Sequence, residues 1–335
     1  MKKKLAAVSF SALLAIVASS TTSGFASWNT KYWTNEKNFN RISSFNVSEN
    51  LPEGSKSTTK TSSEVVTASD DGKTLMYTDS DLGVVGLVDI SDPAKPKALG
   101  IVELEAEPTG IAASENNAYI GSNTSESYTN PSGALVQYNL ETRKKIKQCN
   151  VGGQPDSVFV SPDGTFVAVA IENERDEEYK DGVIPQLDEE GNQINPAGYV
   201  ALIKLNKKGN LKCSSIKKVD LTGLASIASS DPEPEFVAIN DLGETVVSLQ
   251  ENNHLAVIDK DGNVISHFTA GIVKQMAGMD TKKDGAHKFK KKLKNVRREP
   301  DGLTWIDNDH FATANEGDYK HKAPGQAKRG GSRSW

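Results

Sequence analysis

The chain has 335 residues, of which 36% are hydrophobic and 25% are charged. This composition is typical of a soluble globular protein and argues against disorder of the whole chain. The formal net charge of −5 argues against general nucleic-acid binding and favours cationic partners, metal ions included.

The first 26 residues have the pattern of a signal peptide. Residues 2–4 are lysines, residues 5–18 form an apolar stretch, and residues 24–26 form a small-x-small cleavage site. The apolar stretch is shorter than the roughly 20 residues needed to cross a bilayer, so we predict cleavage and export over retention as a membrane anchor. Loss of the three lysines takes the formal charge from −5 to −8. The mature protein is expected in the periplasm or outside the cell, without a membrane span.

A polar segment, residues 27–63, separates the signal peptide from the main domain. Its last ten residues have the Ser- and Thr-rich composition of a flexible linker. Ile42, Phe45 and Val47 predict one short strand, which would need a sheet to join.

From residue 64 to residue 335 the chain predicts an all-β domain built from repeats. Short runs rich in β-branched residues alternate with Gly, Asp and Pro turns, and no apolar spacing of helical type appears after the signal segment. Proline opens successive units at positions 108, 155, 234 and 300, and four strands in about 40 residues match one propeller blade. A long polar insertion, residues 174–198, interrupts the third of four complete units.

The fifth unit, which begins at Pro300, holds only two predicted strands. Each blade of a propeller buries its faces against its neighbours. We therefore predict a β-propeller of about four complete four-stranded blades and a partial one, and we favour an incomplete copy of a longer protein. The alternative is closure of the last blade by another element, for which the strand at 42–47 is the candidate.

The sequence does not decide whether the two cysteines, Cys149 and Cys213, form a disulfide. An oxidising compartment would allow them to pair. Each is predicted in the outer strand of its own blade, and outer strands of neighbouring blades usually lie too far apart for disulfide geometry.

Acidic residues recur at two positions of the repeat, before the first strand and after the second. In a propeller these two loops open at the same end of the channel, so the sequence predicts one acid-rich mouth. The predicted ligand face consists of Glu107, Glu233 and Glu235, and the predicted metal ligands are Glu172, Asn173, Glu251, Asn252, Glu299, Asp301, Asn315, Glu316 and Asp318.

Two interpretations of this mouth remain open. Carboxylate and amide oxygens suit a hard cation such as calcium, which could hold a phosphate or ester group for hydrolysis. Alternatively, the same side chains cap backbone amides at the blade turns. No His, Ser or Cys nucleophile aligns with the acids, so no catalytic residue is assigned.

Two further charged segments also allow two interpretations each. The acidic run at residues 172–178 either extends the cation site or is a solvated loop. A basic run in the loop before Pro300 either binds polyanions, including phosphorylated envelope polymers, or only aids solubility. Its candidate polyanion-binding residues are Lys290, Lys291, Lys292, Arg297 and Arg298.

The segments Arg298-Glu299-Pro300-Asp301-Gly302, Thr313-Ala314-Asn315-Glu316-Gly317-Asp318 and Leu249-Gln250-Glu251-Asn252-Asn253 resemble the choice-of-anchor I family of secreted bacterial β-propellers. This family is similar to the YVTN and LVIVD repeat propellers and, more distantly, to propeller phytases and alkaline phosphatases. Its members usually continue beyond the point that corresponds to Gly330-Gly331-Ser332-Arg333.

These patterns give two functional hypotheses. The first is a noncatalytic binding or scaffold module of the cell envelope, which recognises an envelope or extracellular ligand on the acid-rich face. The second is a calcium-dependent phosphatase, phytase or esterase that acts on a phosphorylated small molecule or an ester at the same face, with a metal-bound water as the nucleophile.

Overall fold

The structure, a computed structural model, describes residues 41–55, 58–176, 179, 186–279 and 291–317. The predicted signal peptide lies outside the described residues. Within them, no helix combines the length and the apolar character that a membrane crossing requires.

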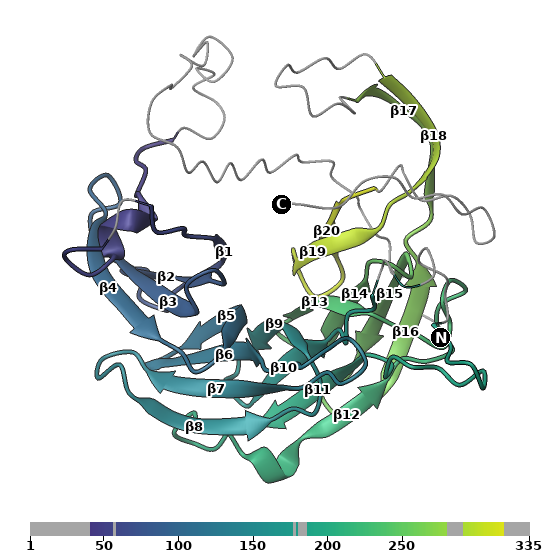
Figure 1. The fold of residues 1–335 in the computed structure, drawn as a ribbon, viewed down its shortest axis with the longest axis horizontal. Helices are drawn as coiled ribbons and strands as arrows, with labels where there is room; N and C mark the ends of the chain where they lie inside the picture. Colours follow the sequence, from purple (N-terminus) through teal and green to yellow (C-terminus); the bar gives the residue numbers. More distant parts are fainter. Residues whose placement is uncertain (1–40, 56–57, 177–178, 180–185, 280–290, 318–335) are drawn as a thin grey trace.

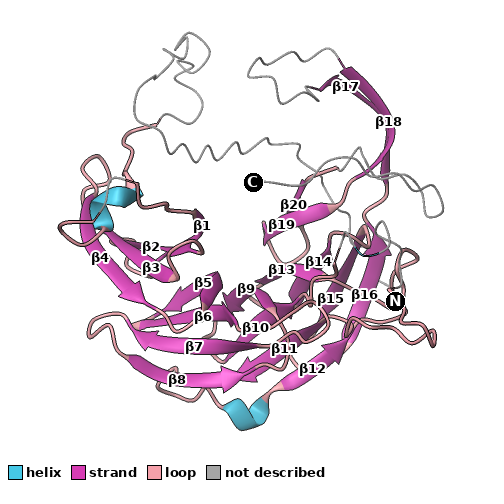
Figure 2. Ribbon diagram, in the orientation of Figure 1, coloured by secondary structure: helices cyan, strands magenta, loops and turns pink. Residues whose placement is uncertain are grey.

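The described chain is an all-β propeller whose sheets fan out in an open arc (Figures 1 and 2). Four sheets have four antiparallel strands each, paired in sequence order. They are blade 1, with β1 (Ser63–Ala68), β2 (Thr74–Asp79), β3 (Val84–Asp89) and β4 (Lys97–Glu103); blade 2, with β5 (Glu107–Ser114), β6 (Asn117–Asn123), β7 (Gly133–Asn139) and β8 (Lys145–Asn150); blade 3, with β9 (Pro155–Val160), β10 (Phe166–Ile171), β11 (Tyr199–Lys204) and β12 (Lys217–Asp220); and blade 4, with β13 (Pro234–Ile239), β14 (Thr245–Leu249), β15 (His254–Ile258) and β16 (Val264–Thr269).

Two shorter sheets follow blade 4. The half blade consists of β19 (Pro300–Trp305) and β20 (Phe311–Asn315), and a separate hairpin precedes it, formed by β17 (Ile272–Met279) and β18 (Lys291–Arg297). The blades and the half blade confirm the repeat predicted from the sequence. The hairpin was not predicted, because its basic residues were assigned to a loop between blades.

The first strand of each blade lines the inside of the arc, and the fourth strand lies at the outside (Figure 1). Successive residues of a strand point to opposite faces of the sheet, so apolar residues on the two faces can pack against the two neighbouring blades. In β10, Val167 and Val169 pack against blade 2, whereas Ala168 and Ala170 pack against blade 4. The core is therefore a series of layers between neighbouring sheets.

The predicted strand at 42–47 is wrong. Residues 41–46 have no regular secondary structure, and the 3-10 helix η2 (Val47–Asn50) follows them. The side chain of Asn50, which is buried, donates to the Tyr77 hydroxyl at 3.0 Å and accepts from the Gly100 amide at 2.9 Å. These bonds hold the segment on blade 1, so it does not join the half blade.

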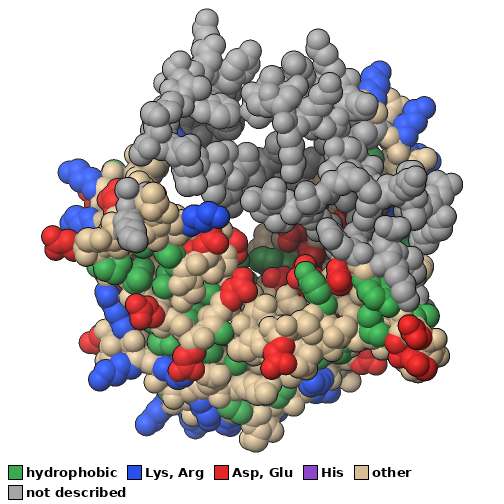
Figure 3. Space-filling view, viewed as in Figure 1, with side chains coloured by type: hydrophobic (Ala, Val, Ile, Leu, Met, Phe, Trp, Pro, Cys, Tyr) green, Lys and Arg blue, Asp and Glu red, His purple; other side chains and the backbone are tan. Residues whose placement is uncertain are grey.

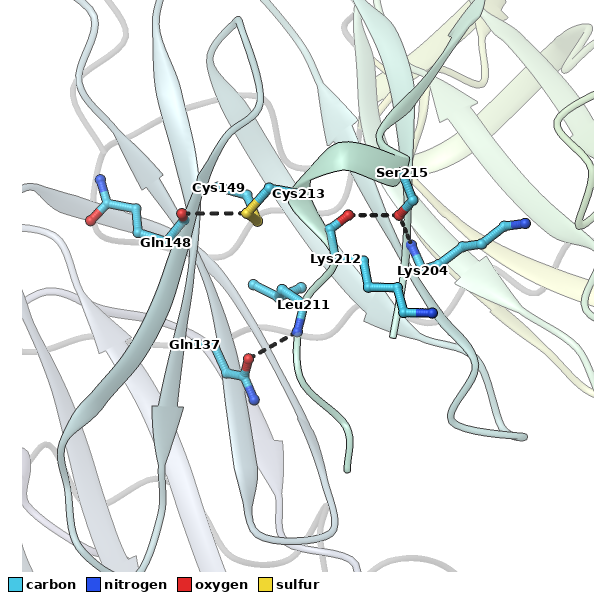
Figure 4. Close-up of a disulfide and its surroundings, with 8 residues drawn as sticks. All are labelled: Gln137, Gln148, Cys149, Lys204, Leu211, Lys212, Cys213 and Ser215. Atoms are coloured by element: carbon cyan, nitrogen blue, oxygen red, sulfur yellow. Dashed lines mark hydrogen bonds between the residues drawn. A yellow bond between two sulfur atoms is a disulfide. The ribbon is translucent and has the colours of Figure 1, made fainter. Parts of the chain in front are cut away.

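The cysteines form a disulfide, which the expected distance between outer strands had argued against. Cys149 lies in the outer strand β8, but Cys213 lies in the 3-10 turn η4 (Cys213–Ser215), and the outer strand β12 begins only at Lys217. The turn leans towards blade 2, and the two Cα atoms are 5.2 Å apart (Figure 4).

A polar contact beside the disulfide fastens the same two blades. The fully buried Gln137 of β7 accepts from the Leu211 amide at 3.1 Å (Figure 4). It also donates to the Asn210 side chain at 3.1 Å. Tyr119 donates to the Gly209 carbonyl at 2.6 Å. The connection between β11 and β12 is thus docked onto blade 2.

Candidate functional site

The first strands of the four blades and of the half blade share one irregularity at the inner edge of the arc. In each, the register with the second strand shifts directly after the same position, which is Ser63 in β1 and a proline in β5, β9, β13 and β19. Such bulges redirect a side chain. The residue after this position is acidic in four sheets and Thr109 in blade 2. We call Glu64, Asp156, Glu235 and Asp301 the inner acids.

The inner acids lie close enough to influence one another. Burial, together with charges that include Asp301 and Glu64, raises the pKa of Asp156 to about 8. Burial and the charges of Glu172, Asp156 and Asp301 raise the pKa of Glu235 well above its usual range. Asp156 and Glu235 are only partly exposed, which weakens solvent screening of like charges. In Figure 3, red acidic side chains lie along the described edge of the hollow near the middle of the face.

Glu172 and Glu251, which follow the second strands of blades 3 and 4, add to this cluster. The pKa of Glu172 is raised well above its usual range by burial and by the charges of Asp156 and Glu233. The charge of Glu251 contributes to the raised pKa of Glu172 and of Glu235. The structure therefore brings Glu172, Glu251, Glu235 and Asp301 of the predicted site together.

Two asparagines of the predicted metal set cap backbone amides. The Asn173 side chain accepts from the Gln154 amide at 2.9 Å, and the Asn252 side chain accepts from the Glu233 amide at 3.0 Å. These are the contacts of the turn-capping alternative. Asn315 instead accepts from the hydroxyl of Thr313, in the same strand β20, at 3.2 Å.

Glu233 lies in a buried ion cluster next to the inner acids. Its carboxylate is 2.5 Å from the guanidinium of Arg175, which also bonds Asp231 at 3.0 Å. All three side chains are at most 5% exposed. Burial raises the pKa of Glu233, and the charge of Arg175 opposes this rise. The cluster connects the start of the insertion in blade 3 with the entry to blade 4.

Four predicted residues lie at the margins of the site or beyond the described chain. Glu299 is buried, has a φ of 45°, and lies 3.9 Å from the guanidinium of Arg297. Glu316 accepts from the Gln250 side chain. Burial and the charge of Glu64 raise the pKa of the exposed Glu107. Asp318 lies outside the described residues.

Three of the predicted polyanion residues belong to a hairpin strand. Lys291, Lys292 and Arg297 belong to β18, Arg298 follows it, and Lys290 lies outside the described residues. The prediction of a plain loop is thus wrong over residues 291–297.

Sequence reasoning did not single out Asp156, Glu64 or Arg175 as site residues. Asp156 follows Pro155 as Glu235 follows Pro234, so aligning the repeats on their prolines would have found it. Arg175 is the one cation inside the acidic run at 172–178. Its position there indicates a partner for buried acids, and Asn173 and Arg175 of the described part of this run, residues 172–176, are buried and not solvated.

The predicted calcium site stays a prediction. In the described part of the chain, no group of three or more His, Cys, Asp and Glu side chains is arranged to hold a metal ion. The carboxylates are instead distributed over several strands, and the predicted amide ligands accept hydrogen bonds from the turns.

Comparisons with known structures found proteins with a similar propeller fold. It is similar to a putative 6-phosphogluconolactonase from Bacteroides uniformis (16% identity, 61% of this chain and 53% of that chain, TM-score 0.41). It is also similar to the periplasmic gluconolactonase of Pseudomonas aeruginosa (17%, 62% and 53%, TM-score 0.41) and to virginiamycin B lyase from Staphylococcus aureus (9%, 76% and 78%, TM-score 0.39). The chain spans 53% of the length of each gluconolactonase.

A search of curated proteins found no match. The profile of the choice-of-anchor I domain matches residues 64–334, which begin within β1 and include every blade described above. The chain belongs to the choice-of-anchor I domain family.

Proposed function

We propose that this protein is a binding module of the cell envelope whose acidic mouth holds a cationic ligand. Membership of the choice-of-anchor I family indicates an exported cell-surface protein. The observation that carries the proposal is the convergence of the inner acids from four sheets on the inside of the arc. Carboxylates crowded by like charges have raised pKa values because a bound proton removes part of the repulsion. A cationic ligand would remove the same repulsion and would replace the proton.

The distribution of the acids favours an organic cation with at least two ammonium groups. A single metal ion needs its oxygen ligands within roughly 2.6 Å, whereas separate ammonium groups can pair with carboxylates on different strands. Calcium is the alternative occupant of the same mouth.

Titration calorimetry with spermine and with calcium tests the proposal. We expect spermine to bind, with an affinity that rises from pH 6 to pH 8 because Asp156 must lose its proton. Asp156→Asn and Glu235→Gln should each weaken binding about tenfold, and Asp261→Asn, in an exposed turn, should leave it unchanged. Tighter binding of calcium would assign the mouth to a metal. Absence of binding by either cation would refute the cation site.

A calcium-dependent phosphatase, phytase or esterase is the second candidate, favoured by one observation. A carboxyl group with a pKa of about 8 is protonated at neutral pH and could donate a proton to a leaving group. Hydrolysis of p-nitrophenyl phosphate or phytate with and without calcium tests this candidate. Turnover that is stimulated by calcium and lost in Asp156→Asn would support the enzyme, and calcium binding without turnover would refute it.

A further inference from the structure

The β17–β18 hairpin stands apart from the blades. It forms its own two-stranded sheet between blade 4 and the half blade, and Figure 1 shows it extending away from the arc. Within the described chain, no other strand packs extensively on it. Packing within the propeller therefore does not explain its presence.

The hairpin is basic on a protein that is acidic overall. Neither strand contains Asp or Glu. Lys274, Lys292 and Lys294 are exposed, and none of them has an ion-pair partner in the described structure. Blue side chains appear in Figure 3 at the upper right, where Figure 1 places the hairpin.

The register of the hairpin places two of these lysines on one face. Lys294 lies opposite Gln275, and Lys292 lies opposite Ala277. Residues two apart on one strand share a face and are separated by about 7 Å. We call Gln275, Lys292 and Lys294 the basic face.

The arginines at the base of the hairpin serve to attach it. Arg298 donates from its guanidinium to the Ala270 carbonyl at 2.8 Å and from its amide to the Gly271 carbonyl at 3.3 Å. Arg297 lies 3.9 Å from Glu299. These contacts attach the hairpin to blade 4 and to the half blade. In the described part of the hairpin, the charges that remain available to a ligand are those of Lys274, Lys292 and Lys294.

We propose that the basic face binds a linear phosphodiester polymer, with successive phosphates on Lys292 and Lys294. Phosphates joined through a three-carbon polyol are six bonds apart, which is about 7 Å in an extended chain with ordinary bond lengths, and this matches the lysine spacing. The amide group of Gln275 adds a donor on the same face. The acidic remainder of the protein repels polyanions, so binding is confined to the hairpin.

Binding of a poly(glycerol phosphate) chain to the complete protein tests this assignment. We expect affinity that falls with salt, and a Lys292→Gln, Lys294→Gln double variant that binds at least tenfold more weakly with a shallower salt dependence. The matched control is Lys207→Gln with Lys208→Gln, two exposed lysines of the β11–β12 connection. This control should bind like the original protein.

Three outcomes would overturn the proposal. They are absence of binding at low salt, equal losses in the double variant and its control, and equally tight binding of heparin or single-stranded DNA. The last would make the hairpin a general polyanion-binding arm. Spermine binding at the mouth should persist in the double variant, so failure at one site is distinguishable from failure at the other.

Discussion

Arg175 neutralises two buried carboxylates that would otherwise oppose folding. It bonds Asp231 at 3.0 Å and Glu233 at 2.5 Å, and its own amide donates to Glu233 at 2.9 Å. Removing one partner of a buried ion pair typically costs about 3–5 kcal/mol because the remaining charge stays buried. We expect Arg175→Met to lower the free energy of unfolding in urea by about that amount.

Arg41→Met is the control for this variant, because Arg41 is exposed and near the start of the described chain. It should change the unfolding free energy by less than about 0.5 kcal/mol. Equal stability of Arg175→Met and the original protein at neutral pH would contradict the assigned role of the ion cluster.

Asp156 should make the protein less stable as the pH rises. Its pKa is about 8 in the folded protein and about 3.9 in an unfolded chain, so the folded state holds the extra proton between these values. Stability contributed by that proton is complete below about pH 4 and is lost as the pH rises towards 8. Asp156→Asn should therefore flatten the fall in unfolding free energy between pH 5 and pH 8.

Urea unfolding at several pH values between 5 and 8 measures this effect, with Asp261→Asn as the exposed control. The slope for one proton is at most about 1.4 kcal/mol per pH unit. A pH dependence that is the same in Asp156→Asn and in the original protein would show that Asp156 is ionised throughout this range.

The disulfide and the turn beside it determine how blades 2 and 3 are joined. The bond closes a loop with a sequence separation of 64 residues, and disulfides typically stabilise by about 2–4 kcal/mol through restriction of the unfolded chain. We expect the Cys149→Ser, Cys213→Ser double variant to lose about that much unfolding free energy in urea. Reduction of the original protein should give the same loss, and a double variant of undiminished stability would contradict the prediction.

A glycine at the start of the third strand lets the next blade approach. A Cβ on Gly198 would lie 2.5 Å from the Ile171 and Glu172 carbonyl oxygens and 2.5 Å from Cδ of Pro234. Forcing atoms into such a site costs about 1–3 kcal/mol. Gly198→Ala should therefore lower the melting temperature. Gly302→Ala, whose Cβ would meet nothing within 4 Å, should not.

The repeat could be predicted from the sequence because its signals are local. Strand alternation and turn residues mark each blade, and the prolines mark each first strand. The structure of residues 41–50 could not be predicted this way, because Asn50 and its partners Tyr77 and Gly100 are far apart in the sequence. The disulfide could not be decided from the sequence for the same reason, since the β11–β12 connection that carries η4 reaches blade 2 through long-range contacts with Gln137.

Of the candidate site, the sequence could indicate only which residue types recur at which positions of the repeat. The acid-rich mouth stays a prediction, and the charge states of its residues depend on burial and on neighbours from other blades. Asp156 and Arg175 acquire their roles only when blades 1, 3, 4 and the half blade are brought together. The spacing of residues within one repeat does not show which residues of other blades will lie next to Asp156 and Arg175.

Stability should be highest in the middle of the arc and lowest at its ends. The second strands β10 and β14 are fully buried, whereas β1 alternates between half-buried and exposed residues and β20 is buried only at Phe311. In the described chain β20 pairs only with β19. Segments with few buried contacts open locally, without global unfolding. We expect amides of β20 and of the β17–β18 hairpin to exchange with solvent well before those of β10.

Hydrogen exchange followed by mass spectrometry measures this order directly. Peptides that cover β10 and β14 should exchange last, at a rate set by global unfolding. In the Arg175→Met variant these peptides should exchange faster, while those of the hairpin should not change, because the hairpin already opens locally. Protection of β20 equal to that of β10 would contradict the prediction and would show that another element covers the free edge of the half blade.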